Sequence, residues 1–272
     1  IPKTRQGIFI SSYNGSSSDV YLMDNSFQTS YYKNFSGDVL GIVVNSFDQQ
    51  LIHSCYTTGS LTAIDLFNGN PLWSIAAQSS PPTPFFTSLM KGSDNKIYTG
   101  YRDGRFKALN TSGAASINGW ANTNFYIEES ALFGDFYVTE QQSIPVGQSK
   151  IVLHWKASGA QHQQAWVNED IIGIYQKNNN EYILLTNNSS NVGNVLFYYL
   201  STGLTGSPFG VSIGKIEDAV EISSGLYLVA EGNNLTYINT NNFTTLNYLT
   251  GVTANLLRYD SFNDELFVVS GN

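Results

Sequence analysis

Short apolar runs separated by polar turns recur from one end of the chain to the other. In the clearest example, a nearly continuous apolar run at 39–44 precedes alternating segments at 51–56, 61–66 and 72–75. Alternation with a period of two, broken by turns such as Asn68-Gly69, predicts antiparallel strands joined by hairpins. The pattern therefore predicts a unit of four strands, of which the first is buried on both faces.

This four-strand unit repeats along the chain. A strand repeat of about 40–50 residues without a helical pattern is typical of a β-propeller, which is built from four-stranded antiparallel blades around a central channel. We therefore predict an all-β chain that forms one β-propeller domain over residues 1–272. The landmarks are apolar residues near the start of each second strand, spaced by 39 to 46 residues: Phe9, Ile52, Tyr98, Tyr137, Tyr182, Tyr227 and Phe267.

The two ends of the repeat set the predicted number of blades. The first segment, at 7–13, has the pattern of a second strand, and the last two, at 255–259 and 265–270, have the patterns of an inner and a second strand. Joining the ends would complete one blade and remove the open edges of the ring. We therefore predict six blades, with the N- and C-terminal strands sharing the closing blade. Seven blades are the alternative if the chain is a fragment of a longer protein.

One repeat resembles a known family. The segment LTAIDLFNGNPLW at 61–73 is similar to the repeat of pyrroloquinoline-quinone-type and YVTN-type propellers. The resemblance implies that Gly69 adopts a positive φ and that Trp73 packs between blades. It concerns the repeat architecture rather than one enzyme. Many quinone enzymes of this type hold a vicinal disulfide over the cofactor, and because Cys55 is the only cysteine, quinone binding is not inferred.

Composition narrows the range of partners. The net charge is −8, only 12% of residues are charged, and no Lys/Arg cluster is present, so nucleic acid and anionic membranes are excluded as partners. Apolar runs are too short to span a membrane. Low charge with abundant Asn, Ser and Thr is typical of secreted proteins. The chain begins at Ile1, and we expect an extracellular, cell-surface or periplasmic protein whose signal peptide has been removed.

Carboxylates gather next to the inner strands predicted at 39–44, 130–133, 171–175 and 219–222. Because these strands begin at the face where propellers usually bind ligands, we expect the carboxylates to converge on the channel mouth. Converging carboxylates need a compensating cation or basic partner, and Ca²⁺ binds several carboxylate oxygens. Lactonase-type propellers are similar in holding a catalytic Ca²⁺ there. The predicted ligand-binding residues are Asp38, Glu128, Glu129, Glu169, Asp170, Glu217 and Asp218.

Five of these residues are the candidate Ca²⁺ ligands, and a solvated polar rim is the alternative interpretation. They are Glu128, Glu169, Asp170, Glu217 and Asp218. By contrast, His53, His154 and His162 have no zinc-site spacing, and the sequence contains no Gly-x-Ser-x-Gly nucleophile motif.

Aromatic residues make up 14% of the chain, and aromatic rings beside Asn and Gln suit a glycan- or protein-binding surface. We therefore favour a non-catalytic module that binds a protein or a glycan, or acts as a scaffold. A Ca²⁺-dependent hydrolase, lactonase- or lyase-like enzyme at the channel mouth is one alternative, and a structural subunit of a surface assembly is another. Aromatic residues near loops or outer edges are Tyr13, Tyr31, Tyr32, Trp120 and Trp166.

Overall fold

The structure is a computed structural model that describes residues 8–23, 28–45, 49–55, 59–76, 86–101, 104–119, 125–143, 149–205, 209–260 and 264–270. Over these residues the chain is all-β, and none of them forms a helix that could cross a membrane. The chain divides into two compact units, Ile1–Glu128 with Ala157–Gly159 and Glu129–Lys156 with Ala160–Asn272. Each unit is described by itself, and a single domain over residues 1–272 stays a prediction.

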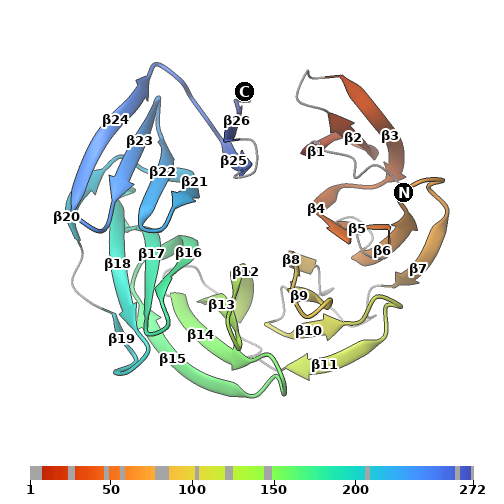
Figure 1. The fold of residues 1–272 in the computed structure, drawn as a ribbon, viewed down its shortest axis with the longest axis horizontal. Coiled ribbons are helices and arrows are strands. Elements are labelled where there is room, and N and C mark those ends of the chain that lie inside the picture. The colour runs from red at the N-terminus through yellow and green to blue at the C-terminus, as the bar shows by residue number, and fades with distance from the viewer. Residues whose placement is uncertain are drawn as a thin grey trace. The chain divides into compact units, whose positions relative to one another are not determined.

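The first unit contains three antiparallel sheets whose strands follow one another in chain order (Figure 1). Sheet 1 has three strands: β1 (Ile8–Tyr13), β2 (Ser17–Met23) and β3 (Thr29–Ser36). Sheet 2 has four: β4 (Val39–Asn45), β5 (Gln50–Cys55), β6 (Ser60–Asp65) and β7 (Pro71–Ile75). Sheet 3 also has four: β8 (Phe86–Lys91), β9 (Ile97–Tyr101), β10 (Phe106–Leu109) and β11 (Ala115–Gly119).

The remaining sheets continue the same order, and β12 begins at the end of the first unit. Sheet 4 comprises β12 (Phe125–Phe133), β13 (Phe136–Ser143), β14 (Ser149–Trp155) and β15 (Gln161–Val167). Sheet 5 comprises β16 (Asp170–Asn178), β17 (Glu181–Asn187), β18 (Gly193–Tyr199), β19 (Leu204–Thr205) and β20 (Phe209–Ile213). Sheet 6 comprises β21 (Ile216–Ser223), β22 (Leu226–Glu231), β23 (Asn234–Asn239) and β24 (Thr244–Thr250). Sheet 7 comprises β25 (Leu256–Asp260) and β26 (Glu265–Val269).

The predicted repeat of four antiparallel strands is confirmed. Sheets 2 to 6 each contain an inner, a second, a third and an outer strand, whereas sheet 1 has three strands and sheet 7 has two. In sheet 5 the outer position is divided between β19 and β20, which both pair with β18. Sheets 1 and 7 belong to different units, so the shared closing blade and the number of six blades stay predictions.

Four inner strands, β4, β8, β16 and β21, begin with a β-bulge, which the sequence pattern did not reveal. The pairing register shifts at Val39/Gly41, Phe86/Ser88, Ile171/Gly173 and Ile216/Asp218. Two predicted strand starts were therefore wrong: β12 begins at Phe125 and β21 at Ile216, so Glu128–Glu129 and Glu217–Asp218 lie within strands rather than before them. A bulge leaves one residue outside the ladder, so a polar residue is tolerated inside an otherwise apolar strand.

Apolar clusters lie between consecutive sheets of each unit. In the second unit, the cluster between sheets 4 and 5 includes Leu153 and Tyr182, and that between sheets 5 and 6 includes Phe197 and Tyr227. Both tyrosines are fully buried landmarks of the sequence repeat. Within each unit, consecutive sheets therefore share a core, as expected of stacked repeats that cannot bury their apolar faces alone.

Trp73 packs between sheets 2 and 3, as its resemblance to the propeller repeat implies. Its indole Nε1 donates a hydrogen bond to the Thr111 carbonyl at 2.8 Å, and its ring lies against Gly113. Gly69 has a φ of 70°, which confirms the expected positive value. The third-to-outer turn of one sheet therefore helps to position the next sheet.

Candidate functional site

The antiparallel order gives each sheet two distinct ends. One end holds the turns that join the first to the second strand and the third to the outer strand, and we name it the turn end. The inner strands begin at the opposite end, where the predicted carboxylates lie.

At the opposite end of sheets 4 and 5, Glu169 and Asp170 are held by neighbouring polar side chains. Glu169 accepts hydrogen bonds from the Thr186 hydroxyl at 2.5 Å and from Asn194 Nδ2 at 3.0 Å. Asp170 accepts one from Gln142 Nε2 of sheet 4 at 3.1 Å. Partial burial raises the pKa of Asp170, and the charge of Lys215 and the Gln142 hydrogen bond offset part of that increase. Asp170 therefore links two sheets.

Glu217 and Asp218 have different surroundings although they are adjacent. Glu217 is exposed and forms an ion pair with Lys215 at 3.0 Å. Asp218 accepts a hydrogen bond from the Leu257 backbone N–H at 2.7 Å and one from Arg258 at 3.1 Å, both in sheet 7. Asp218 therefore fastens sheet 7 to sheet 6, whereas Glu217 makes a solvent-facing contact.

The acidic pairs do not occupy equivalent positions in sheets 5 and 6. Ile171 and Ile216 are the last paired residues before the bulge in β16 and β21. The residue before Ile171 is Asp170, and the residue before Ile216 is Lys215. Lys215 therefore occupies the position of Asp170, and an alignment that places Glu169–Asp170 opposite Glu217–Asp218 is wrong by three residues.

Some of the predicted carboxylates do lie near one another, around Tyr175 of β16. The Tyr175 hydroxyl donates a hydrogen bond to the Ala219 carbonyl at 2.7 Å. Burial raises the pKa of Tyr175, and the negative charges of Asp218, Glu129 and Glu221 raise it further. Asp218, Glu129 and Glu221 therefore act electrostatically on one tyrosine, and Glu221 was not among the residues predicted from the sequence.

Metal binding by the predicted residues stays a prediction. Among the described residues, no three His, Cys, Asp or Glu side chains lie together as metal ligands would. The side chain of Glu128 lies outside the described part, and Asp38 is half-buried in the first unit, just before β4. Glu169, Asp170, Glu217 and Asp218 already accept hydrogen bonds or ion pairs from protein donors, so Ca²⁺ would compete with those donors.

Two buried carboxylates were missed because each is a single Glu within an apolar second strand. Glu140 is fully buried and accepts a hydrogen bond from the Ser149 hydroxyl at 2.6 Å. Glu231 accepts hydrogen bonds from the Gly214 backbone N–H and the Thr236 hydroxyl. These contacts hold one oxygen of Glu140 within sheet 4, and they join Glu231 of sheet 6 to the segment that precedes β21.

At the turn end, the third-to-outer turn has the same backbone form in five sheets. The fourth residue after the third strand has a left-handed backbone conformation. In four sheets that residue is glycine, with φ values of 65° to 82°. In sheet 6 the position is Phe243, with a φ of 62°. A bulky residue in this region is a true outlier and costs on the order of 1–2 kcal/mol. The glycines are Gly69, Gly113, Gly159 and Gly203.

Three successive sheets of the second unit expose an aromatic side chain at this end. The exposed fractions are 38% for Trp155, 39% for Tyr199 and 56% for Phe243. Trp155 closes the third strand of sheet 4, Tyr199 closes that of sheet 5, and Phe243 belongs to the following turn of sheet 6. We name these three residues the aromatic row.

Neighbouring rings support the outer two members of the aromatic row. The ring of Trp155 lies 4.5 Å from that of Phe136 and 4.6 Å from that of His162, measured between centroids. The ring of Phe243 meets Phe197 of sheet 5 edge-on at 6.1 Å. The rings are therefore positioned by packing while a large part of each remains accessible.

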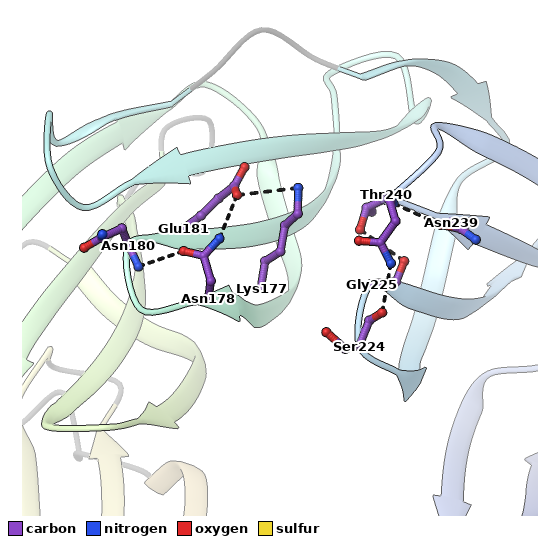
Figure 2. A network of polar contacts seen from close by, with 9 residues as sticks. Lys177, Asn178, Asn180, Glu181, Ser224, Gly225, Asn239 and Thr240 are labelled. Carbon is purple, nitrogen blue, oxygen red and sulfur yellow. Dashed lines mark hydrogen bonds and ion pairs between the residues drawn. The ribbon is translucent and has the colours of Figure 1, made fainter.

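Amide and hydroxyl groups lie in turns at the same end of sheets 5 and 6. In the first-to-second turn of sheet 5, Asn178 donates a hydrogen bond to Glu181 at 3.1 Å, and Lys177 lies 3.5 Å from the same carboxylate (Figure 2). In sheet 6, Thr240 donates to the Gly225 carbonyl at 3.1 Å, and the Asn241 side chain donates to the Ser224 carbonyl. The first set of contacts fixes the first-to-second turn of sheet 5, and the second fixes the third-to-outer turn of sheet 6, which carries Phe243.

The aromatic residues singled out from the sequence lie elsewhere. Tyr13 and Trp166 are exposed, by 46% and 52%, and Trp166 stands on the outer strand of sheet 4. Trp120 and the side chains of Tyr31 and Tyr32 lie outside the described residues. The aromatic row was missed because its members belong to different repeats and only the fold brings their turns to one end.

No protein-family model matches the sequence, and no curated protein matches it. Solved structures do match. A computationally designed protein, Ika8, is 14% identical with a TM-score of 0.68, over 94% of this chain and 76% of that chain. BamB from Moraxella catarrhalis is 13% identical with a TM-score of 0.57, over 90% and 71%. The Dos1 propeller is 15% identical with a TM-score of 0.61, over 83% of this chain but only 64% of that one. These likenesses show that the chain has a β-propeller fold.

Proposed function

We propose that this protein is a non-catalytic propeller that binds an extracellular protein or glycan through the turn end of sheets 4 to 6. The fold supports a binding or scaffold role in general, because rigid propellers carry many unrelated binding sites on their turns and loops. The acidic, weakly charged composition supports an extracellular or periplasmic location. The resemblance of 61–73 to quinoprotein-type repeats concerns architecture and adds no cofactor.

The observation that carries the proposal is the conformation of Phe243. Four other sheets use glycine at this left-handed position, whereas sheet 6 retains an aromatic side chain that is 56% exposed. Backbone strain persists where other interactions or function require it, and inference runs from the observed outlier to the function. An aromatic ring kept on the surface despite its conformational cost is therefore a candidate anchor for a partner.

Trp155 and Tyr199, the other members of the aromatic row, add exposed aromatic side chains at the same end. Exposed Trp and Tyr are rigid side chains that bury a large area on binding, and they are enriched at the centres of binding surfaces. The surrounding Asn, Thr and Ser groups offer hydrogen bonds to the hydroxyl groups of a sugar or the backbone of a peptide. Two lysines lie at this end of sheets 4 and 5: Lys156 follows Trp155, and Lys177 is paired with Glu181.

Binding is tested with a glycan array and with site-specific crosslinking. The wild-type protein and the variants Trp155→Ala, Tyr199→Ala and Phe243→Gly are compared, and Trp166→Ala serves as the control because Trp166 is equally exposed but stands on an outer strand. For protein partners, a photocrosslinker is attached to Thr202→Cys in the turn of sheet 5. Labelling is selective because the one natural cysteine, Cys55, is buried.

We expect at least one ligand whose affinity falls about tenfold or more in each variant of the aromatic row, since hot-spot truncations cost roughly 2 kcal/mol or more. Trp166→Ala should bind like the wild type. Binding that persists in a variant lacking all three aromatic residues would refute the assignment of the site. An enzymatic turnover abolished by changing Glu169 or Asp218 would instead favour the Ca²⁺-dependent enzyme at the opposite end.

A further inference from the structure

In sheets 4, 5 and 6, the two turns at the turn end are joined by a backbone hydrogen bond. The residue just after the third strand donates its N–H to a carbonyl of the first-to-second turn, at 2.8 Å in each sheet. The pairs are Lys156 with Asp135, Leu200 with Asn180, and Thr240 with Gly225. Each member of the aromatic row therefore lies within three residues of a bond that holds a second turn beside it.

The joined turns carry side chains that are available for further hydrogen bonds. Asp135 and Asn180 are exposed, and their side chains have no hydrogen-bond or ion-pair partner among the described residues. Asn242, next to Phe243, is also exposed. Its side-chain oxygen accepts the Thr244 hydroxyl at 2.7 Å, whereas its Nδ2 has no acceptor in the described part of the chain. Each sheet therefore combines an exposed aromatic residue with a carboxylate or amide that can bind hydroxyl groups.

The exposed apolar side chains near these turns are aromatic only. Within two residues of the turns, the large apolar side chains that are exposed are those of the aromatic row. Protein-binding surfaces commonly add arginine to such residues, and no arginine occurs within two residues of these turns. A sugar ring has a flat C–H face that stacks on an aromatic ring, and hydroxyl groups around its rim. The arrangement therefore favours a sugar over a protein segment.

The charges at this end cancel. Within two residues of the same turns, the chain carries two positive and two negative side chains: Lys156, Lys177, Asp135 and Glu181. Lys177 lies 3.5 Å from Glu181, and its ammonium group is 4.9 Å from the centroid of the Phe197 ring (Figure 2). A protein with a net charge of −8 thus presents a locally neutral surface here, which suits an uncharged ligand.

Contacts between sheets make the aromatic row continuous. Between sheets 4 and 5, the Gln163 side chain lies against the turn that follows Tyr199, since a Cβ atom on Gly203 would lie 2.5 Å from its amide nitrogen. Between sheets 5 and 6, the Phe243 ring contacts that of Phe197. A repeat that offers one aromatic ring and one polar group in each sheet suits a ligand that is itself built from repeated units.

We propose that the ligand of the aromatic row is an uncharged linear oligosaccharide that runs across sheets 4 to 6, with its sugar rings stacked on the three aromatic side chains. Hydroxyl groups beside the stacked rings bind Asp135, Asn180 and Asn242. This inference rests on the proposed function, because it names the class of ligand for the same surface. Contacts accumulate along the oligosaccharide, so affinity should increase with the number of sugar units until all three aromatic side chains are covered.

The probes are uncharged hexasaccharides of glucose, mannose, xylose and N-acetylglucosamine, the disaccharide of each, and the galacturonic acid hexamer as a charged comparison. Each is titrated by calorimetry into the wild type, Asn180→Ala and Trp155→Ala. Trp166→Ala is the control, since it removes another exposed indole, one that stands on an outer strand. Thermal unfolding checks that the variants fold. Asn180→Ala should do so in any case, because Asn180 is exposed and its side chain has no partner among the described residues.

We expect at least one uncharged hexasaccharide to bind saturably, and about tenfold or more tightly than its disaccharide. Its affinity should change by less than about twofold between 50 and 500 mM NaCl, because an uncharged ligand is not subject to screening. Asn180→Ala and Trp155→Ala should each weaken binding about tenfold or more, and Trp166→Ala should bind like the wild type.

Three results would overturn the proposal: no uncharged hexasaccharide binds, binding is unchanged in Asn180→Ala and Trp155→Ala, or the galacturonic acid hexamer binds more tightly than every uncharged one. The crosslinking experiment then separates this inference from the proposed function. A protein that crosslinks to Thr202→Cys, and no longer does so when Trp155→Ala is added, would leave the proposed function intact. Absence of such a protein together with absence of oligosaccharide binding would refute both.

Discussion

A single buried histidine makes the stability of the first unit sensitive to acid. His53 of β5 is 5% exposed, its ring lies 4.1 Å from that of Phe35, and neither ring nitrogen has a hydrogen-bond partner among the described residues. Burial lowers its pKa from 6.5 to about 4. The neutral imidazole is therefore the form that the folded state accommodates.

The lowered pKa of His53 determines how the free energy of unfolding should change with pH. Between pH 6.5 and about 4 the unfolded state binds the proton and the folded state does not, so stability falls as the pH falls. The loss is on the order of 3 kcal/mol once the pH is below the folded pKa. Urea unfolding at pH 7, 5.5 and 4.5 should show a smaller loss in His53→Leu than in the wild type. Equal losses in both proteins would mean that His53 does not cause the acid sensitivity.

Adjacent carboxylates in β21 should differ sharply in their effects on stability. Asp218→Ala leaves the Leu257 N–H without its acceptor, so we expect a loss of about 1–3 kcal/mol and faster hydrogen exchange in residues 256–269. Glu217→Ala removes an ion pair between exposed side chains, and we expect a change within about 1 kcal/mol. Similar losses for both variants, measured by chemical denaturation, would contradict the assigned roles.

At the scale of the element, the repeated turn couples one sheet to the next. Gly113 combines a φ of 82° with a position where a Cβ atom would lie 2.7 Å from the Trp73 ring. Gly134 also has a positive φ, 49°, but a Cβ atom there would meet nothing within 4 Å. Alanine substitutions at the two positions therefore distinguish the cost of backbone strain from the cost of disturbing the contact between sheets.

We expect Gly134→Ala to cost about 1–2 kcal/mol through strain alone. Gly113→Ala should cost a further 1–3 kcal/mol or so, because overpacking displaces Trp73 and weakens its hydrogen bond to Thr111. Thermal unfolding ranks the two variants, and Trp73 fluorescence should shift only in Gly113→Ala. Equal destabilisation would show that the turn conformation, and not the indole contact, sets the cost.

The sequence was sufficient to predict the strands but not the contacts between side chains of different strands and sheets. Alternation and turn residues located the second and third strands of sheets 2 to 6 to within three residues, because local polarity reflects burial on the two faces of a strand. The bulge at Glu217 was not predicted, because a bulge changes the pairing between strands without changing the pattern of apolar and polar residues. The aromatic row was not predicted, because its members, Trp155, Tyr199 and Phe243, belong to three different sheets. Only tertiary packing places these residues at one end of the unit, and a single sequence carries no signal for that packing.

At the scale of the whole molecule, the open question for the acidic residues is whether a cation binds them. The net charge of −8 favours cations near the surface, but charge alone does not form a site. Glu169 is oriented by Thr186 and Asn194, and Asp218 by Leu257 and Arg258. A metal ion would have to displace these donors before it gained carboxylate ligands.

We therefore expect Ca²⁺ to have little effect on global unfolding. After EDTA treatment, millimolar Ca²⁺ should raise Tm by less than about 1 °C, since a ligand stabilises the native state only in proportion to its occupancy of a native site. Mg²⁺ at equal ionic strength controls for screening of the net charge. A rise of several degrees with Ca²⁺ alone, lost in Glu169→Gln/Asp170→Asn, would instead establish a calcium site at the predicted residues. That result would require Glu169 to exchange Thr186 and Asn194 for the ion, a change that spectroscopy with a luminescent lanthanide in place of Ca²⁺ would detect directly.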